Sequence, residues 1–357
     1  MATPQAAPPV ATPTASRVVP RVRDFLSRYA LYAVLVALPV YYGIKDLSAE
    51  GSLAPLATNV FQGLSNGSIW ALIAVGYTLV YGIIELINFA HGEIFMIGSF
   101  VSAGLWGTLG LTLVTGPLGL FFGLLLTLII AMVTCGSLNV MIERVAYRPL
   151  RSAPKLAALI TAIGFSFILQ NVGLLWLGGA QAGIPDLLRA QQEVATVLGI
   201  RIQRADVLAI LVTIPLVIAM VTFLTKSRLG KAMRATAQDP DAARLQGINV
   251  DTTISLTFLL GGMLAGAAGL IYALYQTTIW FFQGFQAGLI AFTAAVMGGI
   301  GNLQGAVLGG LIIGIIQQIS DSRIGTEWTP AIVFGYLVLV MVFRPQGLIG
   351  EQTREAG

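Results

Sequence analysis

Cysteine, histidine and charge are all scarce in this chain. Its 357 residues include one cysteine, Cys135, and one histidine, His91, and 10% of them are charged. A single cysteine excludes an internal disulfide, and one histidine without metal-ligand spacing leaves no catalytic or metal site to build. Soluble domains have about 25% charged residues, so an ordinary soluble protein is excluded. We therefore expect a protein that is not an enzyme and that binds no metal or cofactor itself.

Long apolar runs take the place of the missing charge. The chain is 56% hydrophobic, with a mean hydropathy of +0.83. The runs are continuous, which excludes an outer-membrane barrel, and backbone groups in lipid must be paired within their own segment. These features predict an all-α integral membrane protein embedded in lipid. The basic residues are scattered among loops, so their excess indicates membrane topology and not nucleic-acid binding.

Ten apolar segments follow one another along the chain. They lie near 29–47, 57–84, 88–110, 117–142, 156–178, 205–225, 252–276, 286–300, 303–320 and 329–344. Because 286–300 and 329–344 are short for full spans, we expect eight to ten transmembrane helices, and ten fits better. With the N-terminus inside, 15 of the 20 Lys and Arg residues fall in inside segments. This bias predicts that both termini are cytoplasmic.

The same pattern predicts how the chain is divided. Residues 1–28, rich in Pro and Ala and then basic, are expected to form a disordered basic cytoplasmic tail. Residues 29–345 form the transmembrane domain, with a cytoplasmic loop at 226–250, and residues 346–357 form a cytoplasmic C-terminal tail. Ten spans divide into five plus five, which predicts an inverted repeat. The stretches "LVYGIIELINFAHGEIFMIGSF" and "LIYALYQTTIWFFQGFQAGLIAF" support it, since both contain a polar, aromatic break between apolar runs.

Glycines spaced four residues apart predict close helix contacts. Gly262 and Gly266 form one such pair, and a second series contains Gly301, Gly305 and Gly309, then Gly310 and Gly314. Small residues at this spacing let helix backbones approach in lipid. We expect these contacts to pack helices within one bundle; the alternative is that they form a subunit interface.

The loop "TKSRLGKAMRATAQDPDAARLQGINVD" contains a short helix with both ends marked. Asp239 suits the N-cap, Pro240 the first helical position, and Asp241 the positive end of the helix dipole. Gly247 suits the left-handed residue after the helix. So short a helix is unstable alone in water and needs a surface to pack on. "RLGKAM" lacks the residues of a phosphate-binding loop, so any ATPase must be another subunit.

The stretch "ELINFAHGEIF" places Glu85, Asn88, His91 and Glu93 between apolar runs. Charges at membrane depth cost about 2.5–3.5 kcal/mol on insertion scales. Three interpretations stay open: these residues border the translocation path, pair among themselves or with loop arginines to fix the break, or form a cytoplasmic turn with no transport role. Gln276, Gln283 and Gln286, around the second break, belong to the same candidate set.

Several stretches resemble one family in the same order along residues 57–345. "NGSIWALIAVGYTLVYGIIELINFAHGEIFMIGSF" is similar to the signature region of the LivH-type permease, a membrane subunit of branched-chain amino acid ABC importers. "RPLRSAPKLAALITAIGFSFILQN" and "AFTAAVMGGIGNLQGAVLGG" resemble the same family. "DAARLQG" resembles the "EAA…G" coupling loop of ABC importers, with Asp in place of the usual Glu. The coupling-loop residues are then Arg234, Asp239, Asp241, Ala242, Ala243 and Gly247.

The resemblance implies a permease subunit in a bacterial inner (plasma) membrane. Its expected partners are a second homologous permease, two cytoplasmic ATPase subunits that use ATP, and a periplasmic or extracellular substrate-binding protein. Similar permeases handle urea or short amides, and these substrates stay open. The alternative from another class is a self-contained secondary transporter, in which the glutamates would serve coupling ions; the coupling-like loop argues against it.

Overall fold

A computed structural model describes residues 18–112, 115–151 and 153–349. The first half of the chain forms α1 (Val18–Glu50), α2 (Ala54–Ile84), α3 (His91–Thr108), α4 (Pro117–Ile142), a π-helical turn (Glu143–Tyr147), a 3₁₀ turn (Arg148–Leu150) and α5 (Lys155–Leu177). The second half forms α6 (Arg204–Lys226), α7 (Arg228–Gln238), α8 (Pro240–Leu245), α9 (Val250–Gln276), α10 (Gln283–Gly298), α11 (Leu303–Arg323) and α12 (Thr329–Phe343). The protein is thus an all-α membrane protein in its main architecture.

Each predicted apolar segment coincides with a helix. Pro stands in the first turn of α2, α4 and α12, where its missing N–H is not needed. Asn249 and Asn302 cap α9 and α11 by accepting bonds from Thr252 N and Gly305 N, both at 3.0 Å. By length and composition, six described helices can cross a membrane: α2, α4 with its following turns, α5, α6, α9 and α11. α10 and α12 are short, as expected.

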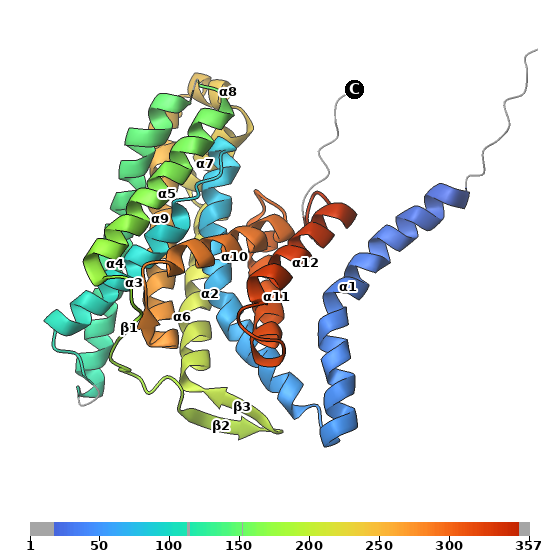
Figure 1. Cartoon of the computed structure of the whole chain (residues 1–357). Helices are drawn as coiled ribbons and strands as arrows, with labels where there is room; N and C mark the ends of the chain where they lie inside the picture. Colours follow the sequence, from blue (N-terminus) through green and yellow to red (C-terminus); the bar gives the residue numbers. More distant parts are fainter. Residues whose placement is uncertain (1–17, 113–114, 152, 350–357) are drawn as a thin grey trace, which may run out of the picture.

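The centre of the molecule is formed by α2 and α9, which are mostly buried. α4, α5 and α6 are mostly exposed although they are strongly apolar. Apolar side chains that face outward on a membrane protein meet lipid tails and not water. Figure 1 shows α3, α4 and α5 to the left of α2, with α9 among them, and α11, α12 and α1 to the right. α3 and α4 pack mainly on α9, and α11 packs mainly on α2.

Small residues set two close helix contacts on the central helices. A Cβ on Gly314 of α11 would lie 2.2 Å from the Cα of Gly67 on α2, and a Cβ on Gly266 of α9 would lie 2.5 Å from the carbonyl oxygen of Ala131 on α4. The predicted glycine pairs therefore serve contacts within the bundle. The pair α2–α11 matches the pair α9–α4, and each pair joins a helix of the first half to a helix of the second.

Both central helices end in the same unusual way. The residue that follows α2, Glu85, has φ 51°, and the residue that follows α9, Thr277, has φ 55°. The chain therefore leaves both helices through a left-handed residue. Each break is followed by a helix, α3 or α10. The N-terminal turns of α3 and α10 cross at the centre: a Cβ on Gly92 would lie 2.3 Å from the carbonyl oxygen of Gly284 and 2.7 Å from the Cα of Gly288.

Two small antiparallel sheets add to the helices, which the all-α expectation did not include. β1 (Ala182–Gly183) pairs with β4 (Thr278–Ile279), and β2 (Glu193–Val197) pairs with β3 (Ile200–Gln203). The β2–β3 turn places Leu198 and Gly199 at φ 52° and 82°, as a tight hairpin requires. The β-branched residues of "EVATVLGIRIQ" around that glycine are the sequence signal.

The predicted tail boundaries need correction. α1 begins at Val18, so residues 18–28 are helical and not a disordered tail. Apolar residues recur there every three to four positions, which continues the helix pattern. At the other end, Leu348 N and Ile349 N donate to Met297 O and Gly298 O at 2.8 and 3.0 Å, so residues 346–349 belong to the folded part. Residues 1–17 and 350–357 lie outside the described residues.

Candidate functional site

The expected coupling helix is α8, and its caps are the predicted ones. Asp239 Oδ1 accepts hydrogen bonds from the backbone N–H groups of Asp241 and Ala242, both at 2.9 Å. At the other end, Gly247 adopts φ 79°, and Gly247 N and Ile248 N donate to Arg244 O and Ala243 O at 3.0 and 3.1 Å. These two bonds form a complete Schellman motif. The six-residue helix is thereby held in shape from both ends.

α8 lies at one end of the molecule and presents an exposed face. Figure 1 shows it at the top, opposite the β2–β3 hairpin. Ala243 is buried against the rest of the loop, while Leu245 is 87% exposed and Asp241 and Ala242 are also exposed. Asp241 pairs with Arg244 at 2.6 Å. The result is a small rigid knob with an apolar tip, a shape suited to a groove in another protein.

Arg234 of the predicted coupling set has a different position. It lies on α7, and its guanidinium donates to the carbonyl oxygens of Leu224 and Thr225 at the end of α6. Cations commonly satisfy the free carbonyls of a helix C-terminus. Arg234 therefore holds α7 against α6, although it is itself exposed.

The opening stretch is divided by the structure into separate environments. Glu85 is exposed and pairs with Lys155 at 2.9 Å, so it fits the interpretation of a turn near the surface. Asn88 is buried, donates to Asn139 Oδ1 at 3.1 Å and accepts from the Tyr147 hydroxyl at 3.2 Å. It joins the break to α4 and to the π-helical turn. Asn88 thus fits the interpretation of a residue that fixes the break.

His91, Glu93 and Gln283 lie buried where α3 and α10 cross; we call these three residues the polar core. The His91 ring packs edge-on against Tyr77 at 4.7 Å, and neither of its nitrogens has a hydrogen-bond partner among the described residues. Glu93 Oε1 accepts from Ser166 Oγ at 3.3 Å, while Oε2 has no partner there.

Gln283 begins α10 just as His91 begins α3. Its Oε1 accepts from Trp280 N at 3.2 Å, and its Nε2 has no partner among the described residues. The next residue, Gly284, leaves room for Glu93: a Cβ there would lie 2.3 Å from Glu93 Oε2. The structure thus brings a carboxylate, an imidazole and an amide to the crossing of the two half-buried breaks. Ser166 and Tyr77 join them, and no sequence motif indicated either residue.

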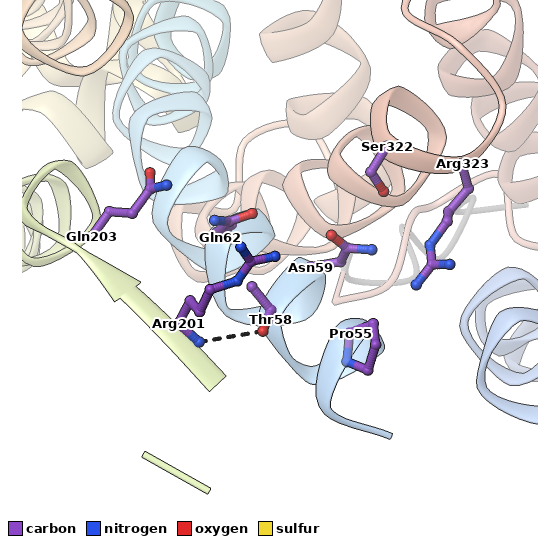
Figure 2. A pocket seen from close by; sticks show the side chains of 8 residues that line it. All are labelled: Pro55, Thr58, Asn59, Gln62, Arg201, Gln203, Ser322 and Arg323. Atoms are coloured by element: carbon purple, nitrogen blue, oxygen red, sulfur yellow. Dashed lines mark hydrogen bonds between the residues drawn. The ribbon is translucent and has the colours of Figure 1, made fainter. Parts of the chain in front are cut away.

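Gln276 and Gln286 lie elsewhere, in a polar pocket at the end of α9 farthest from α8. A second pocket, of about 340 Å³, opens on the same end of the molecule between β3, the start of α2 and the end of α11 (Figure 2). There Arg201 N donates to Thr58 Oγ1 at 3.3 Å. Arg323 pairs with the buried Asp46 at 2.8 Å, and Arg201 lies 4.0 Å from Glu193. Polar groups therefore cover this end.

A buried ion network around Glu143 was not predicted from the sequence. Glu143 is fully buried, and both Arg148 and Arg151 bind its carboxylate. Ser255 Oγ on α9 donates to Glu143 Oε2 at 2.7 Å, and Arg151 also binds Asp251. The network ties the π-helical turn to the start of α9, close to α8. Its only sequence signal is the cluster of charges in "ERVAYRPLR".

Comparison with known proteins gives a consistent result. The family described as "Branched-chain amino acid transport system / permease component" matches residues 59–342. The high-affinity branched-chain amino acid transport system permease protein LivH of Escherichia coli (strain K12) is 41% identical over 301 residues, 83% of this chain and 96% of the relative. The corresponding BraD protein of Pseudomonas aeruginosa is 41% identical over 299 residues, 82% and 95% of the two chains. The probable LivH of Methanocaldococcus jannaschii is 26% identical over 302 residues, 81% and 90% of the chains. With its apolar helices and small-residue contacts, the chain is a multi-pass membrane protein that belongs to this family of branched-chain amino acid transport permeases.

Proposed function

We propose that the chain is the membrane-spanning permease subunit of an ATP-driven importer for branched-chain, hydrophobic amino acids. The observation that supports this most strongly is the similarity to LivH and BraD, which extends over nearly their whole length. The chain itself is a transport subunit and not an enzyme. ATP hydrolysis would take place on separate ATPase subunits, since the sequence lacks a phosphate-binding loop.

Each end of the molecule suits a different soluble partner. α8 would dock on an ATPase subunit, because its capped shape is fixed in advance and its Leu245 tip is exposed. The opposite end has the β2–β3 hairpin and the polar pocket of Figure 2, which suit a soluble substrate-binding protein. A second homologous permease would complete the pathway, and two ATPase subunits would serve the two coupling helices.

The proposed topology is ten spans in a five-plus-five inverted repeat, with both termini cytoplasmic in a bacterial inner membrane. Three pairs of equivalent features support it: left-handed ends of α2 and α9, crossing helices α3 and α10, and the contacts α2–α11 and α9–α4. The orientation follows from the Lys and Arg bias. Single cysteines in a Cys135→Ala background test it: label applied to intact cells should reach position 192 and not position 231, and the reverse pattern would exclude this topology.

The polar core is proposed to border the translocation path. Its support is its central position and the unpartnered atoms of His91, Glu93 and Gln283 among the described residues. Ionisable residues within membrane helices usually face a pathway or a partner. Glu85 and Asn88 are assigned structural roles at the break, in line with their hydrogen bonds.

The experiment is reconstitution of the chain with its co-expressed partners. Proteoliposomes that contain the permease pair and ATPase subunits, supplied with the binding protein and ATP, should accumulate radiolabelled leucine. Urea and acetamide serve as competitors and should not reduce leucine uptake. Uptake of leucine driven by an ion gradient without ATP would instead show a self-contained secondary transporter, and preferential uptake of urea would correct the substrate.

A further inference from the structure

A polar pocket at the end of α9 opposite α8 has no assigned task. It encloses about 410 Å³, within the range of roughly 300–1,000 Å³ that is typical of ligand sites. Its lining residues come from separate elements: Gln276 ends α9, Trp280 follows β4, Gln286 lies on α10, and Glu327 lies between α11 and α12. Residues so distant in sequence meet here because the second break returns the chain to this end of α9.

The short ladder between β1 and β4 builds one wall of the pocket. Ala182 stands opposite Ile279 and Gly183 opposite Thr278, and Ile184 N donates to Thr277 O at 3.0 Å. The antiparallel register therefore places Gln181, just before β1, beside Trp280, just after β4. Both residues line the pocket. Besides packing Ile279 and Ala182 against the core, the two strands thus position these two lining residues.

The floor of the pocket is aromatic. Tyr272 precedes Gln276 by one helical turn on α9, so the two side chains share a face. The Tyr272 ring packs edge-on against Phe95 at 5.2 Å and lies 6.0 Å from Trp70. Tyr272 thus packs the floor of the pocket against α3 and α2.

The lining has complementary chemical groups. Glu327 is the one lining residue with a charged side chain, and it forms no ion pair with another described residue. The side-chain amides of Gln276 and Gln286 likewise form no hydrogen bonds within the described part of the chain. A carboxylate accepts hydrogen bonds from an ammonium group, and amide N–H groups donate to a carboxylate. Trp280 and Tyr272 offer ring faces to an apolar group or to the ammonium.

We propose that this pocket is a receiving site for a free α-amino acid with an apolar side chain. Glu327 binds its ammonium group, Gln276 and Gln286 bind its carboxylate, and Tyr272 and Trp280 contact its side chain. The inference rests on the proposed function, since it takes the transported amino acid as the ligand. It adds a substrate-recognition role to the permease, where the binding protein alone would otherwise select the substrate.

The test measures binding of radiolabelled leucine to the purified permease–ATPase complex without binding protein. Leucine should bind saturably. Isocaproate, which lacks the ammonium group, and isoamylamine, which lacks the carboxylate, should each compete about tenfold or more weakly, which corresponds to about 1.4 kcal/mol. Glu327→Gln should weaken leucine binding by a similar factor and leave competition by isocaproate unchanged. Glu193→Gln, an exposed glutamate at the same end but outside the pocket, is the matched control.

If Glu327→Gln does not assemble, Gln286→Leu provides the same test from the carboxylate side. Leucine binding that is unchanged in both variants overturns the proposal. So does the absence of saturable binding in a complex that imports leucine once its binding protein is added. A wild-type complex that imports no amino acid refutes the proposed function itself, so the two failures are distinguishable.

Discussion

Glu85 and Glu93 lie eight residues apart, and substitution by Gln should affect stability and uptake differently at the two positions. Glu85 and its partner Lys155 have side chains that are 66% and 73% exposed. Water screens such a pair, and exposed ion pairs contribute little to stability. Glu85→Gln should therefore leave the melting temperature unchanged and reduce uptake little. Of the three interpretations left open by the sequence, these contacts fit best a turn near the surface, with Lys155 and not an arginine as the partner of Glu85.

Glu93 is the opposite case, since its side chain is fully buried. Among the described residues its contacts are one long hydrogen bond from Ser166, 3.3 Å, and no cation. An ionised carboxylate in such a place costs several kcal/mol even after relaxation. Gln has nearly the same shape without the charge, and its amide can still accept from Ser166. Replacing buried ionic groups by uncharged residues of similar volume is often neutral or stabilising, by up to about 1–4 kcal/mol for ion pairs, so Glu93→Gln should keep or raise the free energy of unfolding.

The assay records thermal stability of the detergent-solubilised complex together with leucine uptake per assembled transporter. We expect Glu93→Gln to be as stable as the wild type or more stable, with uptake strongly reduced, because a charge that weakens the fold is retained for transport. Ser166→Ala is the control for the lost hydrogen bond. A Glu93→Gln complex that is less stable by more than about 1 kcal/mol would show that the carboxylate has a structural partner in the assembly, and the reasoning would fail.

Three further predictions concern the contacts that shape the bundle and its coupling end. Gly314→Val should reduce folded yield sharply, because the new Cβ would meet backbone atoms of α2 at 2.2 and 2.4 Å. Gly164→Ala is the control, since the position of its Cβ is open space. A normal melting temperature of Gly314→Val would contradict this prediction. Gly247→Val should reduce co-purification with the ATPase while membrane insertion stays normal, because a β-branched residue in the left-handed conformation of Gly247 costs about 1–2 kcal/mol. Gly247→Asn should have a milder effect. Full uptake in Gly247→Val would exclude α8 as the coupling helix. Glu143→Gln should lower the free energy of unfolding by about 1–3 kcal/mol. This loss is smaller than that expected on breaking a fully buried ion pair, because the side chains of Arg148 and Arg151 are 38% and 24% exposed. An unchanged denaturation curve of the complex would argue against the network.

The helices could be predicted from the sequence because lipid leaves few alternatives. An apolar run of about 20 residues must pair its backbone internally, so each predicted segment became a helix. Apart from the start of α1, the ends of these helices lie within a few residues of the predicted ones. The caps of α8 could also be predicted, because Asp239 and Gly247 bond to backbone groups within about one turn of their own positions. The Val18 start of α1 and the β2–β3 hairpin were not predicted. Their helix and strand patterns are weak, and the polar, Pro-rich or basic composition around them favoured a tail and a loop.

The polar candidates were harder to place, because their partners are distant in sequence. Nothing local distinguishes Glu85 from Glu93, yet one meets Lys155 at the surface and the other meets Ser166 in the centre. The same holds for the glutamines: Gln283 is buried beside Gly284, while Gln286, less than one turn later, faces the outward pocket. A helix rotates by 100° per residue, so neighbours in one motif belong to different environments once the fold is formed.

α9 joins the end that carries α8 to the end that carries the pocket of Gln276 and Glu327 as one continuous helix. Its 27 residues span about 40 Å, from Val250, just after α8, to Gln276 at that pocket. Along the way its glycines contact backbone atoms directly: Gly262 and Gly266 meet α4, and Gly269 meets the Phe95 carbonyl of α3. Backbone contacts of this kind leave no side chains to rearrange, so α9 cannot slide on these neighbours without separating from them. A displacement of α8 by an ATPase would therefore move α9, α4 and the start of α3 together, and with them Tyr272 and Glu93.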